Sequence, residues 1–300
     1  MKIVVTGSLG HISRPLTIDL VRKGHSVTVI SRNPERKPAI EALGANAAIG
    51  TMEDAAFLTS TFAQADAVYV MEATSPESFT DPTLDMTAVM DQIVENYQQA
   101  ILKSGVRRVV HLSSIGAHTD QGNGILRLHH RAEEILKTLP SNVSLSFLRP
   151  VGFYSNLLGF IPTIKTQGVI ASNYGGDQKK PWVSPYDIAT VAAEELTAYS
   201  QNRNVRYVAS EEISCDEIAG ILGAAIGLPQ LRWVVIPDEQ LLHGMVAFGM
   251  NPAIAAGFVE MNAAIRTGQL YEDYLRHRPA LGRVKVRDFA SEFATAYHQA

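Results

Sequence analysis

Residues 2–13 read KIVVTGSLGHIS, and the order of residue types in this stretch predicts how the chain begins to fold. The run from Lys2 to Val5 is short and rich in β-branched residues, which predicts a buried strand. Gly7 and Gly10 follow it, and the apolar periodicity of a helix begins after them. Glycines at such a junction permit a tight turn and let backbone N–H groups approach a phosphate closely. The stretch therefore predicts a strand, a phosphate-binding turn and a helix.

This turn is typical of a dinucleotide site, because the N-terminus of the following helix would face the pyrophosphate. Its spacing is Gly-x-x-Gly-x-x-Ser, whereas the standard fingerprint is Gly-x-Gly-x-x-Gly. A bare strand-to-helix turn is the alternative. We expect the cofactor contacts of the turn from Thr6, Gly7, Leu9, Gly10, His11 and Ile12.

The end of the second predicted strand indicates which dinucleotide is bound. It reads Ser31-Arg32-Asn33, with Arg36 and Lys37 close behind and no carboxylate to accept a ribose 2′-hydroxyl. A guanidinium suits a 2′-phosphate. Arg32 and Arg36 therefore favour NADP(H) over NAD(H), with a solvated surface arginine as the alternative.

Apolar strands alternate with helices through the first half of the chain. Such alternation is typical of a doubly wound parallel sheet, the Rossmann type of α/β fold. After Pro150, glycine and proline residues interrupt the alternation of strands and helices. Helices are predicted for most of the remaining chain, apart from strands near 205–208 and 232–236. We expect a Rossmann domain over residues 1–152, its sheet completed by about 182–210, and a smaller, mostly helical substrate domain over 153–181 and 211–300. The further strands are expected at 26–30, 46–49, 67–71, 108–112 and 143–148, with helices at about 84–103 and 132–139.

Composition excludes several other classes of protein. Of the 300 residues, 46% are hydrophobic and 19% charged, as in ordinary globular proteins, and the net charge is -4 with no basic tract for nucleic acid. The single Cys215 cannot form an internal disulfide and is expected to be inert. The apolar stretch 241–259 contains His243, Asn251 and Pro252, so we expect no membrane span. A cytoplasmic monomer or homodimer is expected.

Several motifs together resemble the NmrA-like family of the atypical short-chain dehydrogenase/reductase superfamily. The resemblance implies a Rossmann domain with a small C-terminal substrate domain, and NADP(H) as the usual cofactor. Some members reduce quinones, dyes or phenylpropanoids, and others are redox sensors. The motifs are Thr6-Gly7-x-x-Gly10, Ser31-Arg32-Asn33-Pro34, Leu112-Ser113-Ser114, Leu148-Arg149-Pro150-x-x-Phe153-x-x-Asn156 and Ser184-x-x-Asp187-Ile188-Ala189.

The resemblance also points to the positions where catalysis is expected. Dehydrogenases of the superfamily carry a serine after the fifth strand and a Tyr-x-x-x-Lys pair on the next helix, where the lysine lowers the pKa of the tyrosine and holds the nicotinamide ribose. Ser113 and Ser114 stand at the serine position, but residues 115–140 contain no Tyr-x-x-x-Lys. His129 falls near the lysine position. We expect Ser113 and His129 to contact cofactor and to be catalytic, with a helix cap and a structural histidine as the respective alternatives.

Further candidates follow the sixth strand. Phe153, Tyr154 and Asn156 are predicted to line the nicotinamide end, and Tyr154 is a weak candidate for the general acid; core packing is the alternative. Asp187 is expected to cap a helix. The apolar segment 240–264 suits a pocket wall or lid, a subunit interface or plain core.

No metal site is indicated, because the adjacent His129 and His130 would diverge on a helix. Taken together, the glycine turn, the two arginines and the family resemblance predict an NADPH-dependent oxidoreductase that transfers hydride to a quinone-like or conjugated carbonyl compound. We expect this substrate to be a small hydrophobic or aromatic molecule. The alternative is a non-catalytic NADP(H) sensor that acts through a protein partner, and the missing Tyr-x-x-x-Lys pair favours it.

Overall fold

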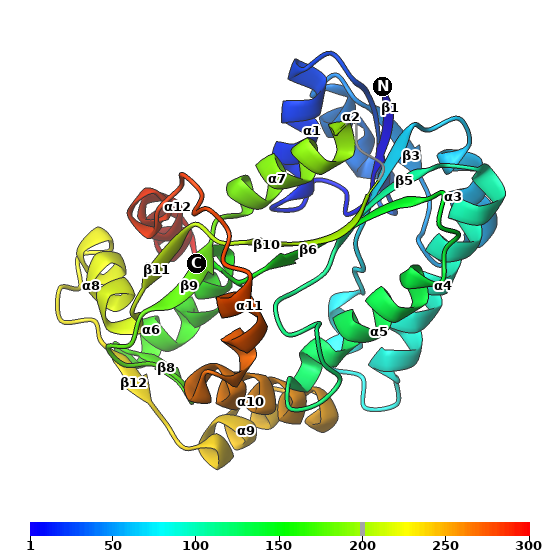
Figure 1. The fold of residues 1–300 in the computed structure, drawn as a ribbon. Helices are drawn as coiled ribbons and strands as arrows, with labels where there is room; N and C mark the ends of the chain where they lie inside the picture. Colours follow the sequence, from blue (N-terminus) through cyan, green and yellow to red (C-terminus); the bar gives the residue numbers. More distant parts are fainter. Residues whose placement is uncertain (199–201) are drawn as a thin grey trace.

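The computed structural model describes residues 1–198 and 202–300. Its central sheet has seven parallel strands in the order β10-β6-β5-β4-β1-β2-β3 (Figure 1). The predicted doubly wound parallel sheet is confirmed. The strands are β1 (Lys2–Val5), β2 (Ser26–Ser31), β3 (Asn46–Ile49), β4 (Ala67–Val70), β5 (Arg108–Leu112), β6 (Ser144–Pro150) and β10 (Arg203–Val208).

Helices cover both faces of this sheet. The helices α1 (Ser13–Arg22) and α7 (Pro185–Thr197) pack together on one face, and α3 (Ala55–Phe62), α4 (Met86–Ser104) and α5 (Arg127–Lys137) lie on the other (Figure 1). Successive residues of β1 serve different faces: Val5 packs with α1 in one buried cluster and Val4 with α4 in the other. The strands are therefore apolar throughout, as expected for a sheet buried on both sides. Short helices η1 (Pro34–Arg36), α2 (Lys37–Glu41), η2 (Pro76–Phe79) and η3 (Gly124–Leu126) lie in the connections.

The C-terminal part forms a third buried cluster around two short sheets. One sheet has the order β11-β9-β7, and in the other β12 pairs with β8. These strands have two to four residues and lie outside the strand–helix alternation that marks the central sheet, so the sequence pattern predicts only β12. The elements are β7 (Gly152–Phe153), η4 (Tyr154–Phe160), α6 (Ile161–Gln167), β8 (Ile170–Ser172), β9 (Lys180–Val183), β11 (Glu211–Ile213), α8 (Cys215–Ala225), β12 (Trp233–Val235), α9 (Asp238–Ala247), α10 (Pro252–Thr267), η5 (Gln269–Tyr271), α11 (Glu272–Arg276) and α12 (Val286–Gln299). No helix within the described residues is long and apolar enough to cross a membrane.

The prediction that Asp187 caps a helix is wrong. Ser184 is the N-cap of α7, and its hydroxyl accepts a hydrogen bond from the Tyr186 N–H at 3.2 Å. The buried Asp187 carboxylate instead accepts from the backbone N–H groups of Arg283 and Val284, at 3.2 and 3.1 Å. It thereby fastens the segment before α12 to the sheet domain, a contact across 97 residues that no local pattern encodes.

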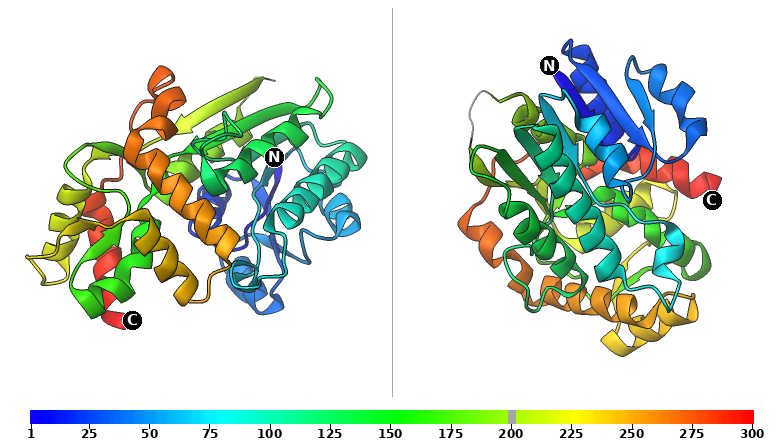
Figure 2. Two further views of the ribbon diagram at one scale, coloured as in Figure 1. Left: turned by 90° about the horizontal axis from the view of Figure 1, so that it is seen from below. Right: turned by 90° about the vertical axis from the view of Figure 1, so that its right-hand side faces the viewer.

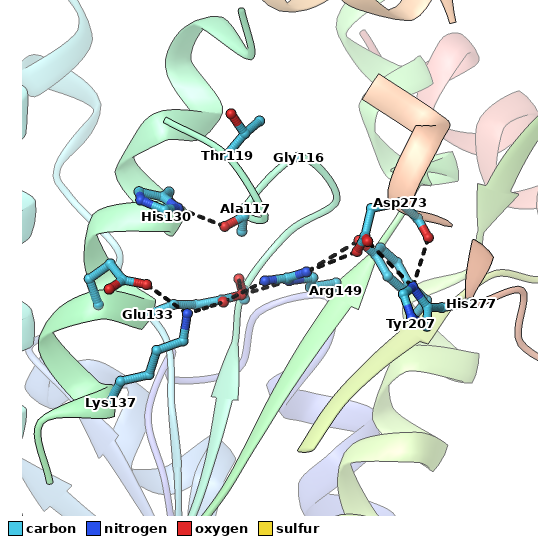
Figure 3. Close-up of polar contacts among 12 residues, drawn as sticks. Gly116, Ala117, Thr119, His130, Glu133, Lys137, Arg149, Tyr207, Asp273 and His277 are labelled. Carbon is cyan, nitrogen blue, oxygen red and sulfur yellow. Dashed lines mark hydrogen bonds and ion pairs between the residues drawn. The ribbon is translucent and has the colours of Figure 1, made fainter. Parts of the chain in front are cut away.

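A buried ion pair inside the sheet domain also contacts the C-terminal part of the molecule (Figure 3). The Arg149 guanidinium on β6 donates to both carboxylate oxygens of Glu133 on α5, at 2.8 and 2.7 Å. Arg149 also donates to Asp273 on α11 at 3.3 Å, and the Tyr207 hydroxyl on β10 donates to the same Asp273 oxygen at 2.6 Å. Because Glu133 is fully buried, its charge depends on these partners.

Helix α10 is held against the sheet domain by contact between two backbones. Gly124 in η3 has φ +57°, and a Cβ there would lie 2.1 Å from the Gly257 carbonyl oxygen of α10. Only glycine allows so close an approach. Seen from below in Figure 2, α10 (orange) crosses in front of the central sheet.

The ion pair leads to a stability prediction with an adjacent control. Glu133→Ala leaves the buried Arg149 charge without its main partner, so we expect a loss of about 3–5 kcal/mol in the free energy of unfolding. Glu134→Ala removes an exposed carboxylate that pairs with Lys137 at 2.7 Å, and should cost under about 1 kcal/mol. Urea unfolding of both variants measures the difference, and equal losses would show that the buried pair has no special role.

Candidate functional site

The glycine turn after β1 has little room for side chains. Gly7 has φ +84°, and a Cβ there would lie 2.6 Å from both the Met71 sulfur and the Ser13 hydroxyl oxygen. Ser13 stands where the standard fingerprint has its third glycine, and its buried hydroxyl donates to the Thr6 carbonyl at 2.8 Å. The serine thus ties the start of α1 to the end of β1, which explains how the variant spacing keeps the same turn.

Backbone donors of this turn are available to a ligand. Among the described residues, no acceptor takes a hydrogen bond from the N–H groups of Leu9, His11 or Ile12. Unpaired N–H groups at the start of a helix suit a phosphate, so the turn fits the pyrophosphate of a dinucleotide. The side chain of Thr6 takes no part: it is fully buried, and its hydroxyl accepts from the Met71 N–H at 3.0 Å.

The end of β2 lies beside the turn. The Ser8 hydroxyl donates to the Ser31 hydroxyl at 3.0 Å, and the Ser8 N–H donates to the Ile30 carbonyl at 3.1 Å. Arg32 is exposed and directly follows Ser31, and the exposed Arg36 ends the short helix η1 further along. Arg32 is therefore next to the glycine turn, as a 2′-phosphate contact would require.

A cavity of about 500 Å³ opens at the carboxyl ends of β4, β5 and β6. Ligands of doubly wound folds bind in this position. The sheet domain contributes the polar Glu72, Ser114 and His129 as well as apolar residues that include Phe79, Met86, Met90 and Leu128, and the C-terminal part adds aromatic, methionine and other apolar side chains. The latter are Phe153, Tyr174, Pro181, Trp182, Cys215, Phe258, Met261, Ile265, Leu270 and Tyr271.

Glu72 lines this cavity and forms a buried pair with His111. The two carboxylate oxygens of Glu72 lie 3.0 and 3.1 Å from Nε2 of His111, and both side chains are almost inaccessible. Burial opposes ionisation of Glu72, but the charge and hydrogen bond of His111, together with His129 and a backbone hydrogen bond, hold the pKa of the carboxyl below its usual value. A negative charge is therefore kept inside an apolar cavity.

His129 also lines the cavity, within electrostatic range of Glu72. Its buried Nδ1 atom has no hydrogen-bond partner among the described residues. Burial lowers the pKa of His129 and the His111 ring lowers it further, while Glu72 and Glu133 act in the opposite direction. The imidazole is thus mainly neutral at pH 7, and it has a buried ring nitrogen without a partner among the described residues.

Two of the predicted catalytic residues do not face the cavity. The buried Ser113 hydroxyl donates to Glu133 at 2.6 Å, so it supports the ion pair, and Ser114 lines the cavity instead. Tyr154 is fully buried in the C-terminal cluster, stacked on Phe289, with its hydroxyl 3.2 Å from Glu211. The structure thus contradicts a role for Tyr154 at the nicotinamide end.

The other predicted residues are placed as follows. Phe153 and Asn156 line the cavity. Of the segment 240–264, Phe258, Met261 and Asn262 of α10 line it, whereas α9 does not. Cys215 lines it as well, and burial raises the pKa of its thiol to about 12, so it stays protonated.

Sequence reasoning missed Glu72 and His111. Val70 pairs with His111 across β4 and β5, so Glu72 lies two residues beyond that pair, at the sheet edge where the cavity opens. The sequence did contain a signal for both residues, because each is a polar residue at an apolar strand. His111 lies within one predicted buried strand, and Glu72 directly follows another predicted buried strand.

Comparison of the sequence with known proteins gives relatives that match this fold and cofactor site. A family model described as NAD(P)H-binding matches residues 7–198. The chain is 28% identical over 299 residues to (4-alkanoyl-5-oxo-2,5-dihydrofuran-3-yl)methyl phosphate reductase of Streptomyces griseus, covering 98% of this chain and 99% of that protein.

Solved structures share the fold at lower identity. An NADPH-dependent quinone oxidoreductase from Escherichia coli superposes with a TM-score of 0.74 at 19% identity, covering 97% of this chain and 98% of that one. The triphenylmethane reductase of Citrobacter sp., crystallised with NADP(H), gives a TM-score of 0.73 at 20% identity, covering 97% and 99%.

The chain belongs to the NAD(P)H-binding family. The resemblance to atypical short-chain dehydrogenases/reductases is thereby confirmed.

The arginine beside the turn gives a test of cofactor choice. Arg32→Ala removes a guanidinium that only the 2′-phosphate of NADPH would engage, so we expect NADPH affinity to fall about 10–100-fold and NADH affinity to change little. Calorimetric titration with both cofactors measures this. Arg22→Ala, at the opposite end of α1, is the control, and equal losses for NADPH and NADH in Arg32→Ala would contradict the assignment.

Proposed function

We propose that the protein is an NADPH-dependent reductase of a conjugated carbonyl or quinone-like compound. The observation that carries the proposal is the apolar cavity at the carboxyl ends of β4 to β6, beside a glycine turn with unpaired N–H groups. The turn would hold the pyrophosphate through Leu9, His11 and Ile12, and Arg32 the 2′-phosphate. A bound reduced nicotinamide supplies a hydride.

The relatives support this class of reaction. The Streptomyces protein is named a reductase of a 5-oxo-2,5-dihydrofuran, which is a lactone ring with a carbon–carbon double bond. Conjugation of such a bond to a carbonyl makes its carbon electrophilic. An acceptor of this kind needs mainly proximity and orientation, which the closed cavity would provide without a Tyr-x-x-x-Lys pair.

The cavity contains a group suited to supply the proton that accompanies the hydride. In the protonated state, Nδ1 of His129 is a donor directed at no protein acceptor among the described residues. The nearby Glu72 carboxylate would stabilise that protonated state, and His111 holds Glu72 in place. We assign His129 as the proton donor and Glu72 as its positioning partner.

Substitution of His129 tests this assignment. His129→Gln should reduce kcat about 100-fold, because positioned acid catalysis contributes at least that much, while leaving the Kd for NADPH nearly unchanged. His130→Gln is the control, since His130 contacts the Ala117 carbonyl at 3.0 Å and does not line the cavity. A kcat in His129→Gln equal to that of the wild type would remove His129 from the reaction.

The pH dependence of kcat provides a second test. Because burial lowers the pKa of His129, its donor form is lost as the pH rises, and kcat should fall from the acid side through a pKa below 6.5. Glu72→Gln removes a charge that opposes this lowering, so the descending limb should move to lower pH. A profile that does not move would contradict the link between Glu72 and His129.

Titration with four nucleotides distinguishes the reductase from a sensor. A reductase should bind NADPH and NADP⁺ with comparable affinity and should oxidise NADPH when a soluble benzoquinone or an unsaturated lactone is added. A preference of tenfold or more for one redox form, about 1.4 kcal/mol, with no oxidation of NADPH by either acceptor, would favour the sensor instead.

A further inference from the structure

The cavity carries a second charge that the proposed reaction does not use. Among the described residues that line it, the charged side chains are Glu72 and Lys180, together with the titratable His129. Glu72 is paired with His111 at 3.0 Å. Lys180 comes from the C-terminal part, on β9, whereas Glu72 and His129 belong to the sheet domain.

Lys180 has no acidic partner. Within the part of the chain that the structure describes, no carboxylate lies within 4.0 Å of its Nζ atom. Its contacts are weak: Nζ lies 3.4 Å from the amide oxygen of Gln178 and 5.5 Å from the centre of the Tyr271 ring. The neighbouring Lys179 differs, because it is exposed and lies 3.9 Å from the Glu217 carboxylate.

The local backbone holds Lys180 at the cavity wall. It pairs with Ile213 between β9 and β11, and it is only partly exposed. Cys215, the first residue of α8, lines the same cavity. Because the thiol of Cys215 stays protonated, it does not neutralise the ammonium group.

Placing a charged ammonium group beside apolar side chains costs free energy unless an opposite charge lies close to it. The tyrosine ring compensates only in part. An anionic group on a ligand would complete the site, and the apolar walls would take the rest of that ligand.

We propose that Lys180 binds an anionic substituent of the substrate, a phosphate or a carboxylate, while the reducible part of the molecule lies toward His129 and Glu72. The inference rests on the proposed reductase function and narrows it. The preferred acceptor is an amphiphilic anion, and neutral quinones and cationic dyes are reduced with a lower kcat/KM.

Three matched acceptors test the subsite: one unsaturated lactone bearing a hydroxymethyl, a phosphonooxymethyl or a carboxymethyl group. The wild type should show kcat/KM at least tenfold higher for one of the anionic lactones than for the neutral one, mainly through KM. Which of the two anions is preferred distinguishes phosphate from carboxylate recognition. An anionic and a neutral lactone reduced equally well by the wild type would overturn the proposal.

Variants separate Lys180 from its neighbour. Lys180→Ala should bring the ratio of kcat/KM between anionic and neutral lactones close to one, Lys180→Arg should restore most of it, and Lys179→Ala should keep the wild-type ratio. An unchanged ratio in Lys180→Ala would overturn the proposal. The proposal would also be overturned if Lys180→Ala weakened NADPH binding by a larger factor than it lowered the anionic-to-neutral ratio of kcat/KM. Lys180 would then bind the cofactor and not the substrate.

Binding without turnover separates this proposal from the reductase function. The saturated phosphonooxymethyl lactone should bind the protein–NADP⁺ complex at least tenfold more tightly than its hydroxymethyl counterpart, and Lys180→Ala should abolish the difference. If this holds while no acceptor is reduced, the subsite stands and the reductase fails. If the neutral lactone is reduced but charge gives no advantage, the reductase stands and the subsite fails.

Discussion

The buried ion pair between Glu133 and Arg149 is the contact on which the rest of the arrangement depends. Three elements meet there: α5 through Glu133, β6 through Arg149, and α11 through Asp273 (Figure 3). A buried pair of this kind adds little net stability over apolar residues of equal volume. However, any conformation in which the two side chains separate has a higher free energy, because each charge would then be buried without a partner.

This constraint reaches the candidate site through the geometry of α5. His129 and Glu133 are four residues apart, so they lie on the same side of the helix, one turn from each other. With Glu133 fixed by Arg149 and Ser113, the rotation of α5 is set and His129 is held at the cavity wall. Arg149 therefore positions the site from outside it, and the serine expected to be catalytic belongs to this support.

The cavity itself is assembled from both halves of the molecule. The sheet domain supplies Glu72 and His129 together with part of the apolar lining, whereas the C-terminal part supplies the rest of that lining and Lys180. The contact between Gly124 and Gly257 presses α10 against η3, which brings Met261 and Phe258 over the ends of the strands. The polar residues that could transfer a proton and the apolar lining with its one lysine are therefore brought together only when the two parts of the chain pack against each other.

The class of fold and the position of the dinucleotide turn could both be predicted from local sequence. Residues 2–13 and the alternation after them encode this locally, because burial on both faces demands apolar strands and a tight turn demands glycine. Local pattern also marked the two arginines after β2 and the unusual His129. It did not indicate that Tyr154 turns into the core, that Asp187 holds a segment 97 residues away, or that Glu72 meets His111. Those contacts join residues distant in the chain, so only the packing of the sheets and helices against one another could decide them.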